Sequence, residues 1–284
     1  MLRTGRWAAV LAAAVAMAAL ALPPPASAAR SCSEDWVCVK AEANAGDYAL
    51  VASNLRDLPV TVTVDARLTN MAPSVALPVT RTLDPGDRLT IVTLRQKDDN
   101  RSTHYRYWFD WAAGDADARH DDSYRYRLPY AKGKRFGVLQ GYGSTFSHTG
   151  KEYYTVDFNM PEGTPVYAAR EGVVARVQGR HSRGCWESHC GRYANFIVIA
   201  HSDGTTGEYY HLQQHGVLVE PGERVERGQH IGFSGNTGHT TMPHLHFGVY
   251  RPMTWADTQS IEVTFESADG DVAKPRRGRG YVAR

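Results

Sequence analysis

Histidine is the residue type in this sequence with the most capacity for chemistry. The chain has 12 histidines, and histidine is both the commonest metal ligand and a frequent general base. Two of them, His244 and His246, form an HxH pair. In a strand such residues project from the same face about 6.6 Å apart. One imidazole of the pair can therefore bind a metal ion while the other reaches a water molecule beside it.

Two further elements supply side chains of the same kind. His148 is followed nine positions later by Asp157, and the two flank a loop that can turn both toward one ion. Together with one histidine of the HxH pair they make three protein ligands and leave a fourth position open, which is the arrangement of a catalytic rather than a structural zinc site. His211, in a β-type run at residues 208–212, is a third element.

The segments that must position these residues are short and rich in turns. From about Gly137 onward, turn sequences separate short β-rich runs, and no long stretch has a helical period; the turns lie at residues 163–166, 172–175, 221–223 and 235–238. This pattern predicts a second all-β domain with many hairpins.

The first part of the chain has a different pattern. Val60, Val62 and Val64 alternate with polar residues, which predicts a half-buried strand. The aromatic residues at alternate positions of 105–111 share one face, which we interpret as a core face rather than a ligand platform. The spacing favours an N-terminal β-sandwich-like domain. The expected fold class is therefore all-β.

The N-terminus has the pattern of a secretory signal. Arg3 and Arg6 precede an apolar run, and small residues follow at 26–28. The run is about 16 residues, shorter than the roughly 20 that span a bilayer. The expected organisation is a signal peptide, a β-rich accessory domain, a domain that carries the histidine motifs and a basic tail, at residues 1–28, 29–128, 129–266 and 267–284.

Charge and export restrict the partners. Lys and Arg total 32 against 30 for Asp and Glu, and this balance argues against nucleic acid as a partner. We expect an exported monomer, periplasmic or secreted, without a membrane span.

The cysteines of the chain fall in two close pairs, Cys32/Cys38 and Cys185/Cys190, which predicts two disulfides in an oxidising compartment. A zinc knuckle including His189 is the alternative for the second pair, although neither pair has CxxC spacing.

Several motifs occur in a fixed order over about residues 137–252, and together they resemble the lysostaphin/LytM-type zinc metallopeptidases, family M23. The motifs are His148, Asp157 with the following residues 158–166, Gly-Val-Val at 172–174, Tyr-His-Leu at 210–212, residues 225–238, and Pro-His-Leu-His-Phe at 243–247. The resemblance implies a compact antiparallel β domain with one Zn²⁺ in a groove. Most members of the family cut peptide bonds in bacterial peptidoglycan.

Carried over by position, the resemblance implies that His148, Asp157 and His246 are the zinc ligands. It also implies that His211 and His244 are the catalytic pair beside the reacting water, without deciding which of them is the general base. Many relatives have their first His and Asp only four residues apart, and Glu152 occupies that spacing here. We prefer Asp157 because the family-like run follows it directly.

The resulting hypothesis is an exported zinc-dependent endopeptidase that hydrolyses peptide bonds in peptidoglycan cross-links or bridges. The alternative is a non-enzymatic M23-like module that regulates or binds cell-wall hydrolases, and a weaker one is an exported protease with a protein substrate. All five positions are filled, which favours the enzyme. Among the other histidines, His239 is the best candidate to line the groove, because its turn leads into the HxH pair. The bond that is cleaved, and whether the first domain targets, inhibits or spaces the second, are not determined.

Overall fold

The structure is a computed structural model, and it describes residues 32–33, 35–44 and 47–284. The expected signal peptide, residues 1–28, lies outside the described residues. The described part of the chain is almost entirely strands and turns, with three short 3₁₀ helices: η1 (Gly150–Glu152), η2 (Ser188–Tyr193) and η3 (Thr254–Ala256). Within that part, no helix is both long and apolar enough to cross a membrane. The all-β fold class is confirmed.

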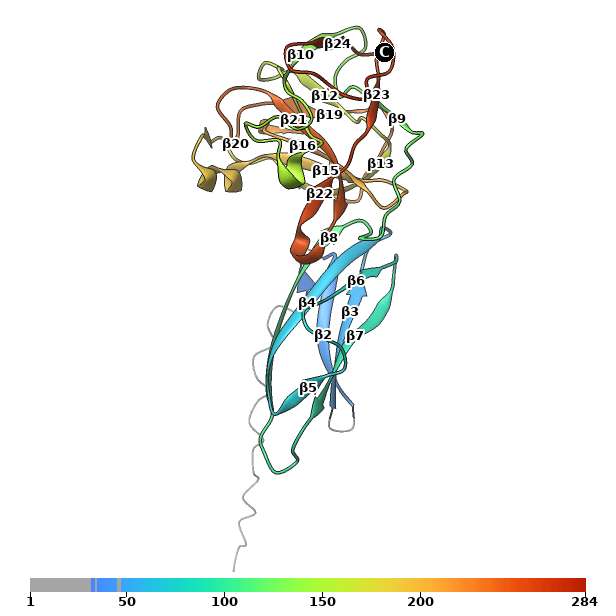
Figure 1. Ribbon diagram of the computed structural model, residues 1–284, viewed down its shortest axis with the longest axis vertical. Helices are drawn as coiled ribbons and strands as arrows, with labels where there is room; N and C mark the ends of the chain where they lie inside the picture. The colour runs from blue at the N-terminus through green and yellow to red at the C-terminus, as the bar shows by residue number, and fades with distance from the viewer. Residues whose placement is uncertain (1–31, 34, 45–46) are drawn as a thin grey trace, which may run out of the picture.

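The first domain is a sandwich of two antiparallel sheets, drawn in blue to green in the lower half of Figure 1. One sheet has five strands, in the order β1 (Cys32–Ser33), β2 (Val37–Asn44), β3 (Asp47–Asn54), β7 (Arg88–Gln96) and β5 (Met71–Pro73). The other has three, in the order β6 (Val79–Leu83), β4 (Val60–Thr69) and β8 (His104–Ala113). Their facing apolar side chains form one core, in which Trp36, in the turn between β1 and β2, stacks on Trp111 of β8 with ring centroids 5.1 Å apart. The aromatic residues at alternate positions of β8, from Tyr105 to Trp111, contribute to this core, as expected.

The second domain is built on a nine-stranded antiparallel sheet. Its order is β18 (Arg224–Val225), β13 (Gly172–Gln178), β15 (Phe196–Ala200), β16 (Thr206–Tyr210), β21 (Leu245–Pro252), β11 (Val156–Phe158), β10 (Arg135–Gln140) and β24 (Gly280–Val282), with β22 (Thr258–Ser260) also paired to β21. Smaller sheets accompany it: β12 (Pro165–Tyr167), β19 (His230–Ser234) and β17 (Leu212–Val217); β14 (Gly184–Cys185) and β20 (Gly238–His239); and β23 (Thr264–Glu266) and β9 (Arg125–Arg127). The compact antiparallel domain is thereby confirmed.

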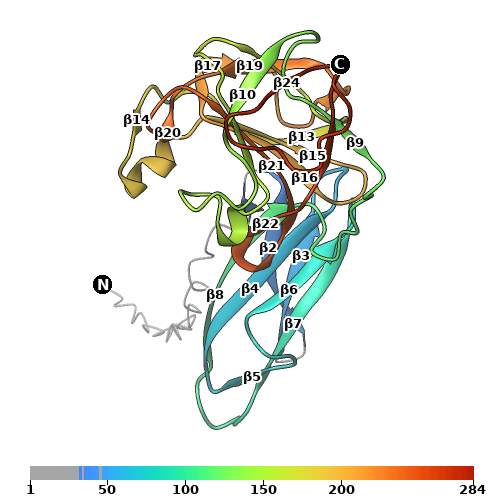
Figure 2. The same cartoon turned by 45° about the horizontal axis from the view of Figure 1, so that its top comes forward.

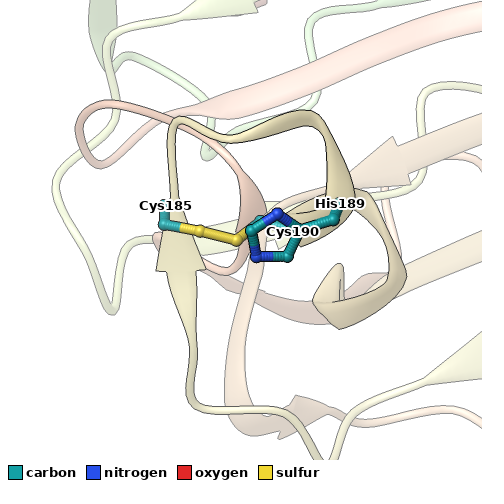
Figure 3. Close-up of side chains that lie close together, drawn as sticks. All are labelled: Cys185, His189 and Cys190. Carbon is teal, nitrogen blue, oxygen red and sulfur yellow. A yellow bond between two sulfur atoms is a disulfide. The ribbon is translucent and has the colours of Figure 1, made fainter.

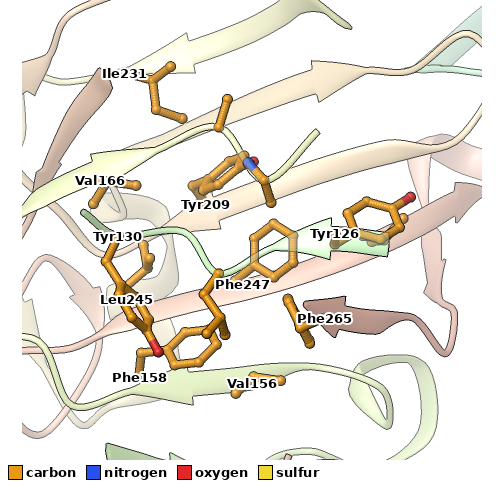
Figure 4. Close-up of a cluster of buried hydrophobic side chains, with 14 of the residues drawn as sticks. Tyr126, Tyr130, Val156, Phe158, Val166, Tyr209, Ile231, Leu245, Phe247 and Phe265 are labelled. Atoms are coloured by element: carbon orange, nitrogen blue, oxygen red, sulfur yellow. The ribbon is translucent and has the colours of Figure 1, made fainter. Parts of the chain in front are cut away.

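One face of the large sheet carries the core of the second domain. Alternate residues of its central strands point to this side, as the two-residue period of a strand requires. Tyr209 of β16, Phe247 of β21 and Phe158 of β11 are fully buried there, and Figure 4 shows them packed together with Phe265. The side chains between them in sequence therefore point to the opposite face of the sheet, where the functional groups gather.

The two domains share buried surface. Ala175, Val198 and Ala200, on β13 and β15 of the second domain, pack in the same hydrophobic cluster as the sandwich. The hairpin between β21 and β22, which contains η3, packs against β4 and β8 at the place where the two domains meet in Figures 1 and 2. Its Trp255 backbone N–H donates to Thr63 Oγ1 at 3.0 Å.

This contact corrects the expectation of a half-buried strand at residues 60–64. All five residues of this part of β4 are buried. The threonine side of the strand is covered because Thr61 Oγ1 donates to the Gly114 carbonyl at 3.0 Å and Thr63 lies beneath the hairpin of the second domain. Strict alternation marks one face as polar, but polar threonines can also be buried when their hydroxyls find partners.

The C-terminal residues complete the large sheet. β24 pairs with β10, Tyr281 is buried, and Tyr130 Oη donates to the Tyr281 carbonyl at 2.8 Å. Residues 276–279 form a turn against the start of the second domain, in which Gly278 N–H donates to the Val138 carbonyl at 2.8 Å. The basic segment at the C-terminus is therefore held close to β10.

Both predicted disulfides are present, Cys32–Cys38 and Cys185–Cys190. Figure 3 shows the second bond with the imidazole of His189 beside it. The knuckle alternative requires thiolates, and here the two sulfur atoms are bonded to each other. The bridge closes the loop between β14 and η2, and β14 pairs with β20, which directly precedes the HxH segment.

Candidate metal centre

The register of four neighbouring strands aligns the functional residues in one row. His246 of β21 lies directly opposite Asp157 of β11 on one side and opposite Tyr210 of β16 on the other. Asp157 in turn lies opposite Gln140 of β10. Residues directly opposite in an antiparallel pair have Cβ atoms about 5 Å apart. The sheet therefore brings together groups that are 89 positions apart in sequence.

His148 reaches this row from the loop between β10 and η1. Its Nδ1–H donates to the Gly141 carbonyl at 3.2 Å, which leaves Nε2 directed at Asp157 Oδ1 at 3.2 Å. His246 Nδ1 lies 2.8 Å from the same oxygen. His148, Asp157 and His246 thus each offer one ligand atom, and these atoms lie within 4.8 Å of one another. His148 is buried, and its Nε2 has no hydrogen-bond partner.

The charges of this group are strongly coupled. Burial opposes ionisation of Asp157, but the contacts with His148 and His246 outweigh it and hold the pKa of the carboxyl well below its usual range. Burial likewise opposes the charged form of His246, and its contacts with Asp157 and Glu152 outweigh this and raise its pKa to about 10. Gln140 fixes the carboxylate further, because its Nε2 donates to Asp157 Oδ2 at 2.6 Å. The site therefore holds an ionised carboxylate at its centre.

His211 joins the site through an unusual backbone conformation. It follows Tyr210, whose side chain points to the row, so an extended His211 would point into the core on the other face of the sheet. Its φ is +65°, in the left-handed region that few non-glycine residues adopt. Its Nδ1–H donates to the Thr237 carbonyl at 2.7 Å, which leaves the Nε2 lone pair free. Such local strain is characteristic of functional sites.

His244 lies beside His211, with ring centroids 4.5 Å apart. Its Nδ1–H donates to the Met242 carbonyl at 2.8 Å, and its Nε2 is 3.8 Å from Asp157 Oδ1. Burial, followed by repulsion from neighbouring histidines, lowers the pKa of His211 to about 3. Burial is also the main reason why the pKa of His244 is lowered. Both imidazoles are therefore neutral, with the same ring nitrogen available as an acceptor.

Glu152 occupies a different position from the ligand role considered for it. Its Oε2 lies 3.6 Å from His246 Nε2, the ring nitrogen that faces away from Asp157. The same carboxylate oxygen accepts a hydrogen bond of 2.6 Å from Tyr250 Oη, which itself lies 3.3 Å from His246 Nε2. A carboxylate at this place orients the imidazole rather than joining Asp157 and His148.

A further buried carboxyl group, that of Glu208, lies near Glu152 and Tyr250. The sequence analysis did not single it out. Glu208 Oε2 accepts a hydrogen bond of 2.9 Å from Tyr210 Oη, and burial raises the pKa of Glu208 to about 7. Glu208 and Tyr210 share a face of β16 with Thr206, and Tyr250 shares a face of β21 with His246. Counting every second residue outward from Tyr210 leads to Glu208, and counting from His246 leads to Tyr250, so strand alternation could have predicted both. No local sequence pattern identifies Gln140.

The centre opens into a cavity of about 680 Å³. Its rim is aromatic: the exposed rings of Phe146 and Trp186 stack with centroids 5.1 Å apart, and Trp186 also contacts His239 at 4.8 Å. His239 lines the cavity, as its position before the HxH pair suggested. All five residues singled out from the sequence, His148, Asp157, His211, His244 and His246, line the same cavity.

Residues 151–261 match the model of Peptidase family M23, and the chain belongs to this family. The resemblance seen in the sequence is thereby confirmed. The matched segment contains Asp157, His211, His244 and His246, while His148 lies three positions before it.

Two curated relatives illustrate the extent of the match. The chain is 43% identical over 91 residues to the peptidoglycan DD-endopeptidase ShyA of Vibrio cholerae, covering 32% of this chain and 18% of that protein. It is 36% identical over 131 residues to lysostaphin of Staphylococcus simulans, covering 46% of this chain and 23% of that protein. The solved catalytic domain of that lysostaphin is 32% identical, with 46% of this chain and 88% of that chain covered and a TM-score of 0.32. This chain spans less than a third of the length of these curated relatives.

Proposed function

We propose that the protein is a zinc-dependent endopeptidase that hydrolyses peptide bonds of bacterial peptidoglycan. The observation that carries the proposal is the convergence of two imidazole nitrogens and one carboxylate oxygen in a single cavity with two further neutral histidines. His148, Asp157 and His246 would hold one Zn²⁺. The donor set fits this ion, since N and O ligands from three residues with an open position are typical of catalytic zinc. The buried Nε2 of His148 supports the fit, because it forms no hydrogen bond although it lies 3.2 Å from Asp157 Oδ1, and a buried polar atom without a hydrogen bond is rare unless it binds something.

When bound, a zinc ion lowers the pKa of a water molecule and polarises the carbonyl oxygen of the scissile bond. The remaining chemistry belongs to His211 and His244. The Nε2 of either residue can accept the proton that the attacking water loses, because the Nδ1–H of each is engaged by a backbone carbonyl. The imidazolium formed in this way can return the same proton to the leaving nitrogen, and before that transfer its positive charge stabilises the negative charge that develops on oxygen.

The supporting residues hold these groups in place. Thr237 and Met242 fix the tautomers of the two histidines through their carbonyl oxygens. Gln140 orients Asp157, and Glu152 with Tyr250 orients His246. Partners of this kind set the direction and basicity of metal-binding side chains. The mostly buried positions also limit the access of bulk water to the reacting groups.

The substrate class is inferred from relatives whose names state it. ShyA and its relative ShyC are named peptidoglycan DD-endopeptidases, and ALE-1 of Staphylococcus capitis is named a glycyl-glycine endopeptidase. An extracellular or periplasmic location accords with this substrate and with the expected signal peptide. The two disulfides also accord with an oxidising compartment.

The test is digestion of purified peptidoglycan with mass spectrometry of the released muropeptides, alongside a denatured protein substrate and zinc analysis. We expect peptide-bond cleavage in peptidoglycan with one zinc per chain. His211→Ala and His244→Ala should each retain zinc and lose roughly 10² to 10⁴ in turnover, the usual contribution of a positioned acid–base group.

Two results would contradict the proposal. Near-wild-type cleavage by both alanine variants would show that the catalytic pair is wrongly assigned. A zinc-free wild type that cleaves nothing but activates a wall hydrolase would favour the regulator instead.

A further inference from the structure

The active-site cavity has one permanently cationic side chain in its lining. Of the described residues that line it, Arg277 is the sole arginine or lysine. It lies in the turn at residues 276–279, beside Val138, Leu139 and Gln140 of β10. This wall is formed by a segment that lies beyond the part of the chain matched by the family model, residues 151–261. The cation is therefore a feature of this chain's own C-terminal segment.

The guanidinium of Arg277 has no structural role in the described part of the chain. It is exposed and has no hydrogen bond, ion pair or ring contact there. Two other arginines of this region are engaged: Arg279 lies over the ring of Tyr281 at 5.8 Å, and Arg135 pairs with Asp269 at 3.1 Å. An arginine without a partner at the edge of a cavity is available to a ligand.

The backbone that carries Arg277 is fixed relative to the metal centre. Gly278 N–H donates to the Val138 carbonyl at 2.8 Å, and Val138 N–H donates to the Arg279 carbonyl at 3.0 Å. Gly278 has a φ of +79°, which suits glycine in this turn. Two residues further along β10, Gln140 donates to Asp157. Arg277 is thus attached to the strand that orients the central carboxylate.

The carboxylates in the cavity do not neutralise this charge. Asp157 is engaged by His148 and His246. Glu152 accepts a hydrogen bond from Tyr250, and Glu208 accepts one from Tyr210. The positive charge of Arg277 is therefore left for a group that enters the cavity.

We propose that Arg277 forms a carboxylate-binding subsite, so that the enzyme selects peptides that present a free carboxylate at this end of the cavity over the same peptides with a carboxamide. A guanidinium is charged at every physiological pH and matches the two oxygens of a carboxylate with parallel N–H donors. A carboxamide offers one oxygen and no charge. Peptidoglycan peptides contain both side-chain and terminal carboxyl groups. The inference rests on the proposed function and deepens it.

The experiment uses three synthetic cross-linked stem-peptide dimers: one with all carboxylates free, one amidated at the side-chain carboxyl, and one amidated at the terminal carboxyl. We expect the wild type to show kcat/KM about fivefold or more higher for the free dimer than for one of the amidated dimers, and the amidated position that matters identifies the carboxylate. Arg277→Gln should lower kcat/KM for the free dimer to that of the amidated one. Arg277→Lys should retain part of the preference, and 0.5 M salt should reduce it.

Arg276→Gln is the matched control, because it removes the same charge from the neighbouring residue, which does not line this cavity. An equal effect of both variants, a wild type indifferent to amidation, or an Arg277→Gln enzyme that keeps the full preference would overturn the subsite. Titration calorimetry of the same dimers with the zinc-loaded wild type and Arg277→Gln provides a second readout. If no dimer is cleaved, the proposed function fails, and tighter binding of the free dimer that depends on Arg277 still decides the subsite.

Discussion

At the scale of single residues, the site distinguishes two carboxylates that the sequence alone could only rank. Asp157 Oδ1 faces His148 Nε2 and His246 Nδ1. Glu152 faces the opposite nitrogen of the same imidazole, His246 Nε2, together with Tyr250. Under the proposed function, a group in the first position would bind the metal, and a group in the second would act through the histidine.

We therefore expect Asp157→Ala to lose zinc and activity while remaining folded. Glu152→Ala should still bind zinc, with an affinity lower by about 10- to 100-fold, the usual cost of removing an outer partner of a ligating histidine. Metal content after dialysis and competition with a chromogenic chelator measure both effects. Complete loss of metal in Glu152→Ala with retention in Asp157→Ala would reverse the assignment.

At the scale of elements, the loop between β14 and η2 forms part of the cavity rim. The Cys185–Cys190 bond closes this loop around Trp186, which stacks on Phe146 from the loop that follows β10. The enclosed segment is short, so the chain-entropy model gives it roughly 2 kcal/mol, less than a long loop would receive. Its main contribution is to hold Trp186 over the cavity.

Peptide mapping of the non-reduced protein should show the 185–190 bridge and no free thiol. We expect the double variant Cys185→Ser/Cys190→Ser to shift tryptophan fluorescence and to lower kcat/KM severalfold with zinc retained. Cys32→Ser/Cys38→Ser is the matched control, because that bridge lies in the first domain. Equal losses of kcat/KM in both double variants would contradict a specific role for the rim.

At the scale of the whole molecule, the two domains share a core instead of being joined by a free tether. Val198 is 7% exposed and packs with residues of the sandwich. The segment that follows β8 and leads into the second domain is itself anchored, since Asp115 N–H donates to the Gly204 carbonyl at 2.9 Å. None of the described residues of the first domain lines the active-site cavity.

We expect the wild type to unfold in one calorimetric transition. Val198→Asp would bury an unpaired charge between the domains and destabilise the protein by about 3 kcal/mol. It should also split the transition in two. Leu218→Asp is the control, because Leu218 is 50% exposed. Coincident melting of the two variants with the wild type would show that the shared core contributes little.

A buried histidine of the second domain, His201, introduces a pH dependence of stability. This residue is buried and its Nδ1–H donates to the Glu171 carbonyl at 2.8 Å. Burial, with repulsion from Arg170, lowers the pKa of His201 from 6.5 to about 4. Between pH 6.5 and about 4, His201 is protonated in the unfolded chain but not in the folded chain. Its contribution to the free energy of unfolding is therefore fully present above pH 6.5 and is lost as the pH falls toward 4. The loss attributable to His201 is about 3 kcal/mol.

Thermal melts of the metal-free protein between pH 7 and 4 measure this effect, since removal of the metal separates it from zinc release. His201→Gln should melt with a shallower dependence on pH over that range. His104→Gln, at an exposed position, should retain the wild-type slope. Parallel slopes for His201→Gln and the wild type would show that this histidine does not govern acid stability.

The sequence by itself determined the all-β class, the two disulfide pairs and all five residues that meet in the cavity, because strand alternation, turn chemistry and ordered motifs are local properties. The tertiary structure decided what depends on pairing across the sheet. The strand registers place Asp157 directly opposite His246 and Gln140 directly opposite Asp157. The left-handed backbone of His211 turns its ring toward the same row of side chains. Packing of the domains buries both sides of residues 60–64, and folding of the C-terminal turn places Arg277 at the cavity. These contacts join residues far apart in the chain, and no local pattern encodes which distant strand becomes the neighbour.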